Sequence, residues 1–549
     1  MAIRVRKPDD EPGAAWVAIT IGLFVAFGGL LFGYDTGTIS GILEMPYWKE
    51  TFSTGHRDAD GQLSISSGQE SLIVSILSLG TFLGALTAAP MADFFGRRMG
   101  LILSTGIVFN LGVILQTAST SQPLFIAGRF FAGYGVGLVS AMIPLYQSET
   151  APKWIRGTIV GTYQLAITIG LFLAAIVNNS TGKRDDSSCY RIPVALQFLW
   201  AIILIGGLLF LPETPRFQVR QGKYDKAAKS LAKLRRLPVD DPGLVDELAE
   251  VKANHDFEMS LGKATYLDCF KGTVGKRLLT GCVLQALQQL SGVNFIFYYG
   301  TAYFTRAGFQ NPFIIQVVTN TVNVVSTLPG LYLVERIGRR NLLLLGAAGM
   351  TVCQFIVAIT GTVAGTQDLP AQRAAIAFVC LFITSFAASW GPAAWIVTGE
   401  LFPLKVRAKS LSMTTATNWL LNFAIAYSTP YLVDAEHANL QSKVFFIWGT
   451  CCLISIGFVW LMIYETKGLT LEQVDELYEM VDKAWLSKKF RPKVSFREAS
   501  TAEEGGRKHS LRQSVAAYEE RRRGKVGEGS IETLREKDNP EQVDTLHDK

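Results

Sequence analysis

Long apolar segments alternate with short polar stretches over most of this chain. A helix needs about 20 apolar residues to cross the hydrocarbon core of a bilayer. The segments that meet this length are 14–42, 70–90, 99–119, 123–146, 157–178, 191–211, 277–304, 312–334, 341–365, 371–398, 409–433 and 443–464. The pattern therefore predicts an all-α membrane protein with twelve transmembrane helices, six on each side of a long polar loop.

The polar stretches divide the chain into five parts. We expect an N-terminal segment at 1–13 and a first six-helix bundle at 14–211. A linker at 212–276 separates it from a second six-helix bundle at 277–464, and a C-terminal segment follows at 465–549. Within the linker, 223–236 suits an amphipathic surface helix. Another is expected at 470–484, where Thr470 is a suitable N-cap with Gln473 three residues later. From about 486 the chain is polar and without apolar periodicity, which predicts disorder.

Lysine and arginine are distributed unevenly between the two sets of loops. Cytoplasmic loops of membrane proteins carry an excess of these residues. One set of loops holds most of them: Arg97, Arg98, Lys153, Arg156, Arg336, Arg339, Arg340, Lys405, Arg407 and Lys409. This set includes the linker and both termini, which we therefore expect in the cytoplasm. The net charge of +6 reflects this loop bias and does not indicate nucleic-acid binding.

Two charged motifs each occur once per half, between apolar segments. A carboxylate precedes Gly-Arg-Arg, and a Glu-x-x-Pro-x-x-x-Arg motif follows later in the same half. Their charged residues are Asp93, Arg97, Arg98, Glu149 and Arg156 in the first half, and Glu335, Arg339, Arg340, Glu400 and Arg407 in the second. Two motifs in register predict tandem, like-oriented halves.

These charged residues have two interpretations. Arginine pairs well with carboxylates, so the network would hold the halves together when the inner mouth is shut and break when it opens. The alternative is that the positive residues only anchor the topology. The register of both motifs favours the gate. A third pair of similar motifs supports the repeat, because each contains Glu-Thr after the last apolar segment of its half. They are Pro212-Glu213-Thr214-Pro215-Arg216 after the sixth segment and Tyr464-Glu465-Thr466-Lys467-Gly468 after the twelfth.

Together with Gln288-Gln289-Leu290-Ser291-Gly292-Val293-Asn294, these motifs resemble the sugar porter family of the major facilitator superfamily, from about residue 20 to 480. Gly33-Tyr34-Asp35-Thr36-Gly37 and Tyr146-Gln147-Ser148-Glu149-Thr150 further resemble its fungal hexose transporter branch. Many relatives carry proline at the position of Tyr464. The resemblance implies the major facilitator fold, with cytoplasmic helices between the halves and after the last span.

Amide side chains are frequent inside the apolar segments. A sugar presents hydroxyls without charge, and neutral amides both donate and accept hydrogen bonds. Gln285, Gln288 and Gln289 share one helix face by their spacing. Bonding between helices, without any ligand, is the alternative. By resemblance, the sugar-contacting residues are Gln164, Gln288, Gln289, Asn294, Asn323, Trp395 and Asn418.

Aromatic residues near these amides also have two readings. Trp395 follows the Trp390-Gly391-Pro392 break, and its middle position in the segment favours the site over an interfacial belt. Tyr298 and Tyr299 suit an outer gate or simple packing.

Two charged residues lie inside apolar segments, where an ionisable group is a functional candidate. They are Asp35 and Arg129. In proton-coupled relatives the matching acid binds the proton and the matching arginine pairs with it. Some uncoupled yeast relatives keep the acid, so both symport and facilitation remain open. Gly133, Gly135 and Gly137 near Arg129 are read as close helix packing, because no strand precedes them as a phosphate loop would need.

The sequence thus predicts uptake of a monosaccharide, foremost glucose, by alternating access at the plasma membrane with proton symport. The alternatives are a facilitative hexose transporter and a transporter-like glucose sensor. No nucleotide loop, metal cluster or nucleophile elbow suggests an enzyme or a cofactor. Expected partners are the sugar, protons and lipid, with ubiquitin or trafficking machinery at the tail. Asn178 and Asn179 begin glycosylation sequons beside the end of a span.

Overall fold

The computed structural model describes residues 15–57, 61, 63–152, 155–260, 265–306, 311–363, 369–434, 437–469 and 471–490. The expected segment 1–13, Thr470 and the tail beyond 490 lie outside these residues. The described part is helical and contains no named strand.

The α-helices of the first half and linker are α1 Ala15–Ile42, α2 Pro46–Phe52, α3 Ser67–Phe95, α4 Arg97–Leu103, α5 Asn110–Ala118, α6 Gln122–Thr150, α7 Arg156–Thr181, α8 Ser188–Phe210, α9 Pro215–Arg220, α10 Tyr224–Arg235 and α11 Pro242–Ser260. Those that follow are α12 Gly272–Leu290, α13 Val293–Arg306, α14 Pro312–Ile337, α15 Arg339–Val363, α16 Leu369–Ala387, α17 Trp390–Leu401, α18 Arg407–Val433, α19 Val444–Met462 and α20 Leu471–Met480. A π-helical turn, Ser104–Phe109, joins α4 to α5.

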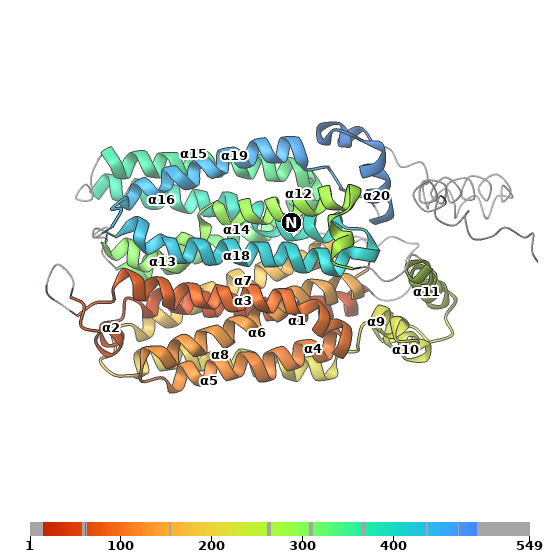
Figure 1. Ribbon diagram of the computed structural model, residues 1–549, viewed down its shortest axis with the longest axis horizontal. Coiled ribbons are helices and arrows are strands. Elements are labelled where there is room, and N and C mark those ends of the chain that lie inside the picture. The colour runs from red at the N-terminus through yellow and green to blue at the C-terminus, as the bar shows by residue number, and fades with distance from the viewer. Residues whose placement is uncertain are drawn as a thin grey trace, which may run out of the picture. The chain divides into compact units, whose positions relative to one another are not determined.

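The long helices run side by side in Figure 1. Among the described residues, 10 helices are long and apolar enough to cross a membrane, against twelve predicted segments. Two of the predicted segments are not among these 10 helices, each for a physical reason. Predicted span 277–304 is divided between α12 and α13, and predicted span 409–433 is α18, whose polar residues lower its hydropathy. The count of twelve therefore stays a prediction.

The linker contains the helices α9, α10 and α11, and the sequence predicted the position of one of them. Helix α10 matches the amphipathic segment expected at 223–236, and α20 lies inside the segment expected at 470–484. Figure 1 shows α9, α10, α11 and α20 beyond the same ends of the long helices, while α2 lies beyond the opposite ends. We call the ends of the long helices near α9, α10, α11 and α20 the linker end of the bundle.

Glycines bring two helix pairs of the first half into backbone contact. A Cβ atom at Gly133 or Gly137 of α6 would lie 2.1 or 2.2 Å from a carbonyl oxygen of α3. One at Gly33 of α1 would lie 2.0 Å from the Ile167 oxygen of α7. Without water to drive helix association, such close packing is a main source of stability in a bilayer. The reading of the α6 glycines as packing residues is thus consistent with the structure.

We expect Gly137→Ala to destabilise the folded protein, because its methyl group would meet the Thr81 backbone oxygen rather than a side chain that can turn away. Overpacking of this kind costs about 1–3 kcal/mol. The measurement is the thermal unfolding midpoint of the purified protein. Gly206→Ala is the control, since nothing lies within 4 Å of a Cβ there, and it should leave the midpoint level or raise it slightly. Equal midpoints for both variants would contradict the packing role.

The side chain of Asn178, in the first sequon, is buried and hydrogen-bonded within the bundle. It is 3% exposed, and its Nδ2 donates to the Gly37 and Thr38 carbonyl oxygens at 3.0 and 3.2 Å. Glycosylation of Asn178 would remove these bonds, whereas Asn179 is exposed.

Polar contacts join the two halves along α3 and α18. Ser71 donates to the Tyr427 carbonyl oxygen at 2.7 Å, Ser78 to Asn422 Oδ1 at 2.6 Å, and Ser412 to the Ala85 carbonyl oxygen at 2.8 Å. Ser67 also bonds to Asp434, at the end of the bundle far from the linker. The bonds of Ser67 and Ser71 join the halves toward that end, and the Ser412 bond joins them toward the linker end.

Candidate functional site

The seventh predicted span is broken between its two helices, α12 and α13. Gly292, between α12 and α13, has a φ of 79°, and a Cβ there would lie 2.4 Å from Trp448. Only glycine suits this conformation and space. The break leaves the Ser291 carbonyl outside the helix ladder, and Gln354 of α15 donates to it at 2.6 Å. The break is therefore a stabilised feature that turns the following residues toward the interior.

Buried amides form one hydrogen-bonded network around this break. Asn418 Nδ2 of α18 donates to Gln285 Oε1 at 2.7 Å and to Gln288 Oε1 at 2.8 Å. Gln289 Nε2 donates to Asn418 Oδ1 at 2.9 Å, and Asn294 donates to Gln289. All five side chains are at most 8% exposed. Four residues predicted for the site thus lie together, joined by Gln285.

The network extends beyond the predicted residues in two directions. Asn422 Nδ2 donates to Gln289 Oε1 at 3.1 Å, and Tyr298 donates to Asn422 Oδ1 at 3.0 Å. Gln288 Nε2 donates to the Trp390 and Gly391 carbonyl oxygens, at 3.0 and 3.2 Å, at the start of α17. The network therefore ties the broken span to both α17 and α18.

The remaining predicted contacts lie on other helices. Trp395 of α17 is 8% exposed and meets the Tyr163 ring of α7 edge-on, with centroids 6.0 Å apart. Gln164 of α7 lies beside Gly391, since a Cβ there would be 3.5 Å from its amide nitrogen. Trp395 thus packs inside the bundle, unlike a belt residue. Asn323 of α14 lies outside the network, because neither of its amide atoms has a hydrogen-bond partner among the described residues.

Asp35 and Arg129 form an ion pair inside the first half. Arg129 Nη1 of α6 lies 3.1 Å from Asp35 Oδ2 of α1, and both side chains are 1% exposed. Gln197 Nε2 of α8 donates to Asp35 Oδ1 at 3.0 Å, and Arg129 Nε donates to the Ile73 carbonyl oxygen of α3 at 3.2 Å. Removing one partner of a buried ion pair is costly. Four helices, α1, α3, α6 and α8, therefore converge on this ion pair.

The charged motif of the first half forms a cluster at the linker end. Arg97 Nη2 lies 3.0 Å from Glu149 Oε1, with side chains 6% and 8% exposed. Thr214 donates to the other Glu149 oxygen. Asp93 lies 3.7 Å from Arg97 and also pairs with the exposed Arg220.

A carboxylate in this cluster caps a helix. Glu213 accepts from the backbone N–H groups of Arg97 and Arg98, at 3.2 and 3.1 Å, at the start of α4. A carboxylate there complements the helix dipole. Burial raises the pKa of Glu213, while N–H donation from Thr214 and Arg98 lowers it. Gly96, with a φ of 92°, leaves room for the carboxylate, which would lie 2.5 Å from a Cβ at that position.

The second half repeats this arrangement. Arg339 Nη2 lies 2.8 Å from Glu400 Oε1, and Arg339 Nη1 lies 2.9 Å from Glu335. Thr466 donates to Glu400 at 2.6 Å. Glu465 accepts from the backbone N–H groups of Arg339 and Arg340 at 2.9 and 3.2 Å. These residues correspond one for one to those of the first cluster.

The two clusters differ from the predicted gate in one respect. The sequence predicted pairs that join the halves, but Arg97 pairs with Glu149 and Arg339 with Glu400, each within its own half. Arg407 donates to the Phe402 carbonyl oxygen at 3.0 and 3.2 Å, again within one half. In each half, the helix that begins with the arginine and the helix that ends next to the glutamate belong to the same bundle, so the two side chains can reach each other without crossing to the other half. The clusters thus stabilise the ends of each half.

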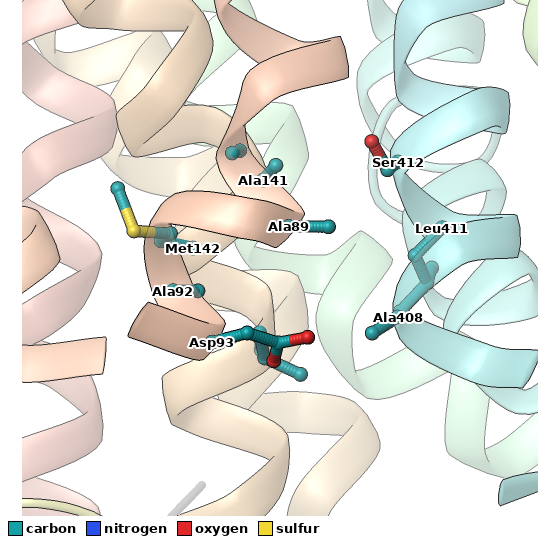
Figure 2. A pocket seen from close by; sticks show the side chains of 10 residues that line it. Ala89, Ala92, Asp93, Ala141, Met142, Ala408, Leu411 and Ser412 are labelled. Carbon is teal, nitrogen blue, oxygen red and sulfur yellow. The ribbon is translucent and has the colours of Figure 1, made fainter. Parts of the chain in front are cut away.

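Contact across the halves at this end comes from the start of α7 and from small residues. A Cβ at Gly157, next to Arg156, would lie 2.7 Å from Glu335 Oε1 and 3.1 Å from Arg339 Nη2. A pocket also opens between the halves, and Figure 2 shows Asp93 and Ala89 facing Ala408 and Ser412 across it. The linker end is therefore closed by contact at α7 but less tightly filled between α3 and α18.

Several residues of the site were missed by sequence reasoning. Gln197, Thr214 and Thr466 were not assigned any role, and Glu213 and Glu465 were noticed only as an echo of the repeat. The available signals were an amide inside an apolar span for Gln197 and a Glu-Thr pair after each sixth helix for the others.

The comparisons with known proteins agree with this architecture. A family described as Sugar (and other) transporter matches residues 21–478. The chain belongs to this sugar transporter family. The major facilitator-type transporter ecdD of Aspergillus rugulosus is 63% identical over 90% of this chain and 93% of its own length. The probable glucose transporter rco-3 of Neurospora crassa is 53% identical, over 90% and 84%.

Two further family members inform the choice of function. The high glucose sensor RGT2 of Saccharomyces cerevisiae is 44% identical over 87% of this chain and 63% of its own length. The solved structure of XylE, a proton:xylose symporter bound to 6-bromo-6-deoxy-D-glucose, matches with a TM-score of 0.73 and 26% identity, covering 85% of this chain and 100% of XylE. The fold is therefore that of the major facilitator superfamily.

Proposed function

We propose that this protein transports a monosaccharide, foremost glucose, across the plasma membrane by alternating access. The observation that carries the proposal is the buried network of neutral amides at the α12–α13 break. Such a network offers both donors and acceptors to an uncharged, hydroxyl-rich ligand. The similarity to rco-3, a probable glucose transporter, and to XylE, a proton:xylose symporter, supports a sugar as the ligand.

Binding would work by exchange of hydrogen-bond partners. In this structure the five amides of the network bond to one another, which offsets the cost of burying them in an apolar interior. Sugar hydroxyls would replace some amide–amide bonds, with Gln288, Gln289, Asn294 and Asn418 as donors and acceptors. Gln164, Asn323 and Trp395 would complete the site from α7, α14 and α17. Trp395 would supply an aromatic face for the C–H surface of the ring.

We further propose that transport is coupled to protons through Asp35 and Arg129. The ion pair is buried among four helices, and XylE is described as a proton:xylose symporter. Protonation of Asp35 would remove the attraction to Arg129 and allow the helices to rearrange. Facilitated transport is the alternative, in which the pair serves only as a structural link.

The proposed orientation places the linker end in the cytoplasm, with both termini on that side. It rests on the excess of lysine and arginine in the loops at this end. The bundles 14–211 and 277–464 would then move against each other around the amide site, with the charged clusters at the inner mouth.

Uptake of radiolabelled glucose in a fungal cell without its own hexose carriers tests the proposal. We expect saturable uptake that unlabelled glucose inhibits. RGT2 makes a glucose sensor the second candidate, because it is 44% identical to this chain. Normal abundance at the cell surface without uptake of any hexose or pentose would overturn the transporter proposal, and glucose-dependent signalling in the same cells would favour the sensor.

Gln288→Ala should weaken sugar binding by about 1–3 kcal/mol, because it removes a partner of Asn418 and of the α17 carbonyl groups. The expected result is a KM raised roughly 5- to 150-fold. The measurement is initial uptake rate against glucose concentration at matched surface abundance. Asn320→Ala is the control, because this buried amide donates only to the Gln316 carbonyl oxygen of its own helix. A KM unchanged by Gln288→Ala would remove Gln288 from the site.

A further inference from the structure

Helix α10 of the linker carries a row of cations on its exposed face. Lys226, Lys229 and Lys233 are exposed, and Arg236 follows the helix at the same spacing of three or four residues. Residues at this spacing share one face of a helix. The opposite face, with Ala227, Leu231 and Leu234, is buried. The basic face therefore points away from the protein.

The charge of these cations is not neutralised by a carboxylate. Among the described residues, no carboxylate forms an ion pair with Lys226, Lys229, Lys233 or Arg236. By contrast, their neighbour Arg235 points inward and pairs with Glu247. A row of cations without carboxylate partners has charge available for an anionic ligand.

The row lies where two spanning helices leave the apolar layer. Lys233 Nζ donates at 2.7 Å to the carbonyl oxygen of Phe210, the last residue of α8. Arg236 lies over the ring of Trp16, in the first turn of α1, 5.3 Å from its centroid. Phe210 is 78% exposed and Trp16 is 56% exposed. Exposed aromatic residues at helix ends are typical of the membrane interface.

A pocket opens between these elements. It is lined by Trp16, Val17, Ala232, Lys233, Arg236 and Leu237. One wall is thus apolar and belongs to a spanning helix, and the other carries two cations from the linker. This pocket is separate from both the amide network and the charged clusters.

We propose that this pocket binds the headgroup of an anionic phospholipid in the cytoplasmic leaflet. Lys233 and Arg236 would contact the phosphate, Trp16 would lie beside the glycerol region, and Lys226 and Lys229 would attract further anionic lipid. The leaflet assignment rests on the proposed orientation. A lipid fits better than a soluble phosphate, because the apolar wall continues into the exposed ends of α1 and α8 and would accommodate an acyl chain.

Native mass spectrometry of the purified full chain in detergent tests this proposal without relying on transport. Phosphatidylserine and phosphatidylcholine are added separately, and bound lipid is counted over a concentration series. We expect tighter binding of phosphatidylserine, weakened about tenfold or more in K233Q/R236Q, since each cation near an anionic surface contributes about fivefold. Raising the salt concentration should weaken binding further.

Two other double variants serve as controls for net charge and for the position of the charges. K276Q/K488Q removes the same charge from two exposed lysines elsewhere and should bind like wild type. K233R/R236K keeps both charges and should retain binding. Equal loss in K233Q/R236Q and K276Q/K488Q would show that only net charge matters, which would overturn the site. Equal competition by soluble glycerophosphoserine would also overturn it, in favour of a free phosphate ester.

Discussion

Asparagine in place of Asp35 will abolish uphill accumulation of sugar while leaving exchange of sugar down its gradient. The amide keeps the size of the carboxylic acid and resembles its protonated form, so the helices can still rearrange. It can neither release nor take up a proton, so the cycle loses its link to the proton gradient. One proton per sugar would otherwise allow about tenfold accumulation for each unit of pH gradient.

The assay uses labelled glucose in proteoliposomes with an imposed proton gradient. Wild type should accumulate glucose above equilibrium, and D35N should only equilibrate it. Counterflow exchange in the same vesicles checks that D35N is folded and active. Asp268→Asn is the matched acid-to-amide control, because it changes a partly exposed linker residue paired with Lys271. If wild type never exceeds equilibrium, the protein is a facilitator and Asp35 is a structural partner of Arg129.

A short series of contacts connects the ion pair to the amide network. Arg129 Nε donates to the Ile73 carbonyl oxygen of α3, and Ser78 of the same helix donates to Asn422 Oδ1. Asn422 in turn donates to Gln289. A movement of α3 after loss of the Asp35 charge would therefore alter the bonding of Gln289. Proximity alone does not establish coupling, and the accumulation assay supplies the functional evidence.

Much of the architecture could be predicted because a bilayer constrains sequence strongly. Segments of lipid-spanning length, separated by short polar loops, predicted the helices, and the repeated motifs predicted two like-oriented halves. The Asp35–Arg129 pair was predictable by resemblance, because a buried charge needs a partner. The grouping of Gln288, Gln289, Asn294 and Asn418 was also expected, and the structure brings these four together.

Other features depend on tertiary packing that sequence periodicity does not contain. Gln197 reaches Asp35 from a helix 162 positions away, and nothing in its own span indicates which amide faces inward. Glu213 and Glu465 cap helices from outside the charged motifs. That Arg97 pairs with Glu149 and Arg339 with Glu400, each within its own half, likewise depends on how the helix ends are placed.

This pairing changes the expected mechanism at the inner mouth. Clusters that are complete within each half can remain intact while the halves move, and so help each half to move as a unit. What separates on opening would then be the contact across the halves, at the start of α7. Gly157 lies against the carboxylate and guanidinium groups of the second cluster with no room for a side chain.

We therefore expect Gly157→Leu to favour the inward-open state and to slow net transport severely. Its side chain would meet Glu335 and Arg339, whose positions are held by Glu400 and Glu465. Crowding of about 1–3 kcal/mol would shift the balance of closed and open forms by roughly 5- to 150-fold. Gly399→Leu is the matched control, because nothing lies within 4 Å of a Cβ there.

The measurement is the labelling rate of a cysteine introduced at Ala408, on the wall of the pocket between the halves, by a reagent confined to the cytoplasmic side (Figure 2). Labelling of the chain without the introduced cysteine is subtracted in each case. The remaining rate should increase when Gly157→Leu is added and should be unchanged when Gly399→Leu is added. Slower uptake with unchanged labelling in a folded protein would show that α7 does not hold the inner mouth shut. The separation of the halves would then have to begin at α3 and α18, where bonds such as Ser412 to Ala85 join them near the pocket.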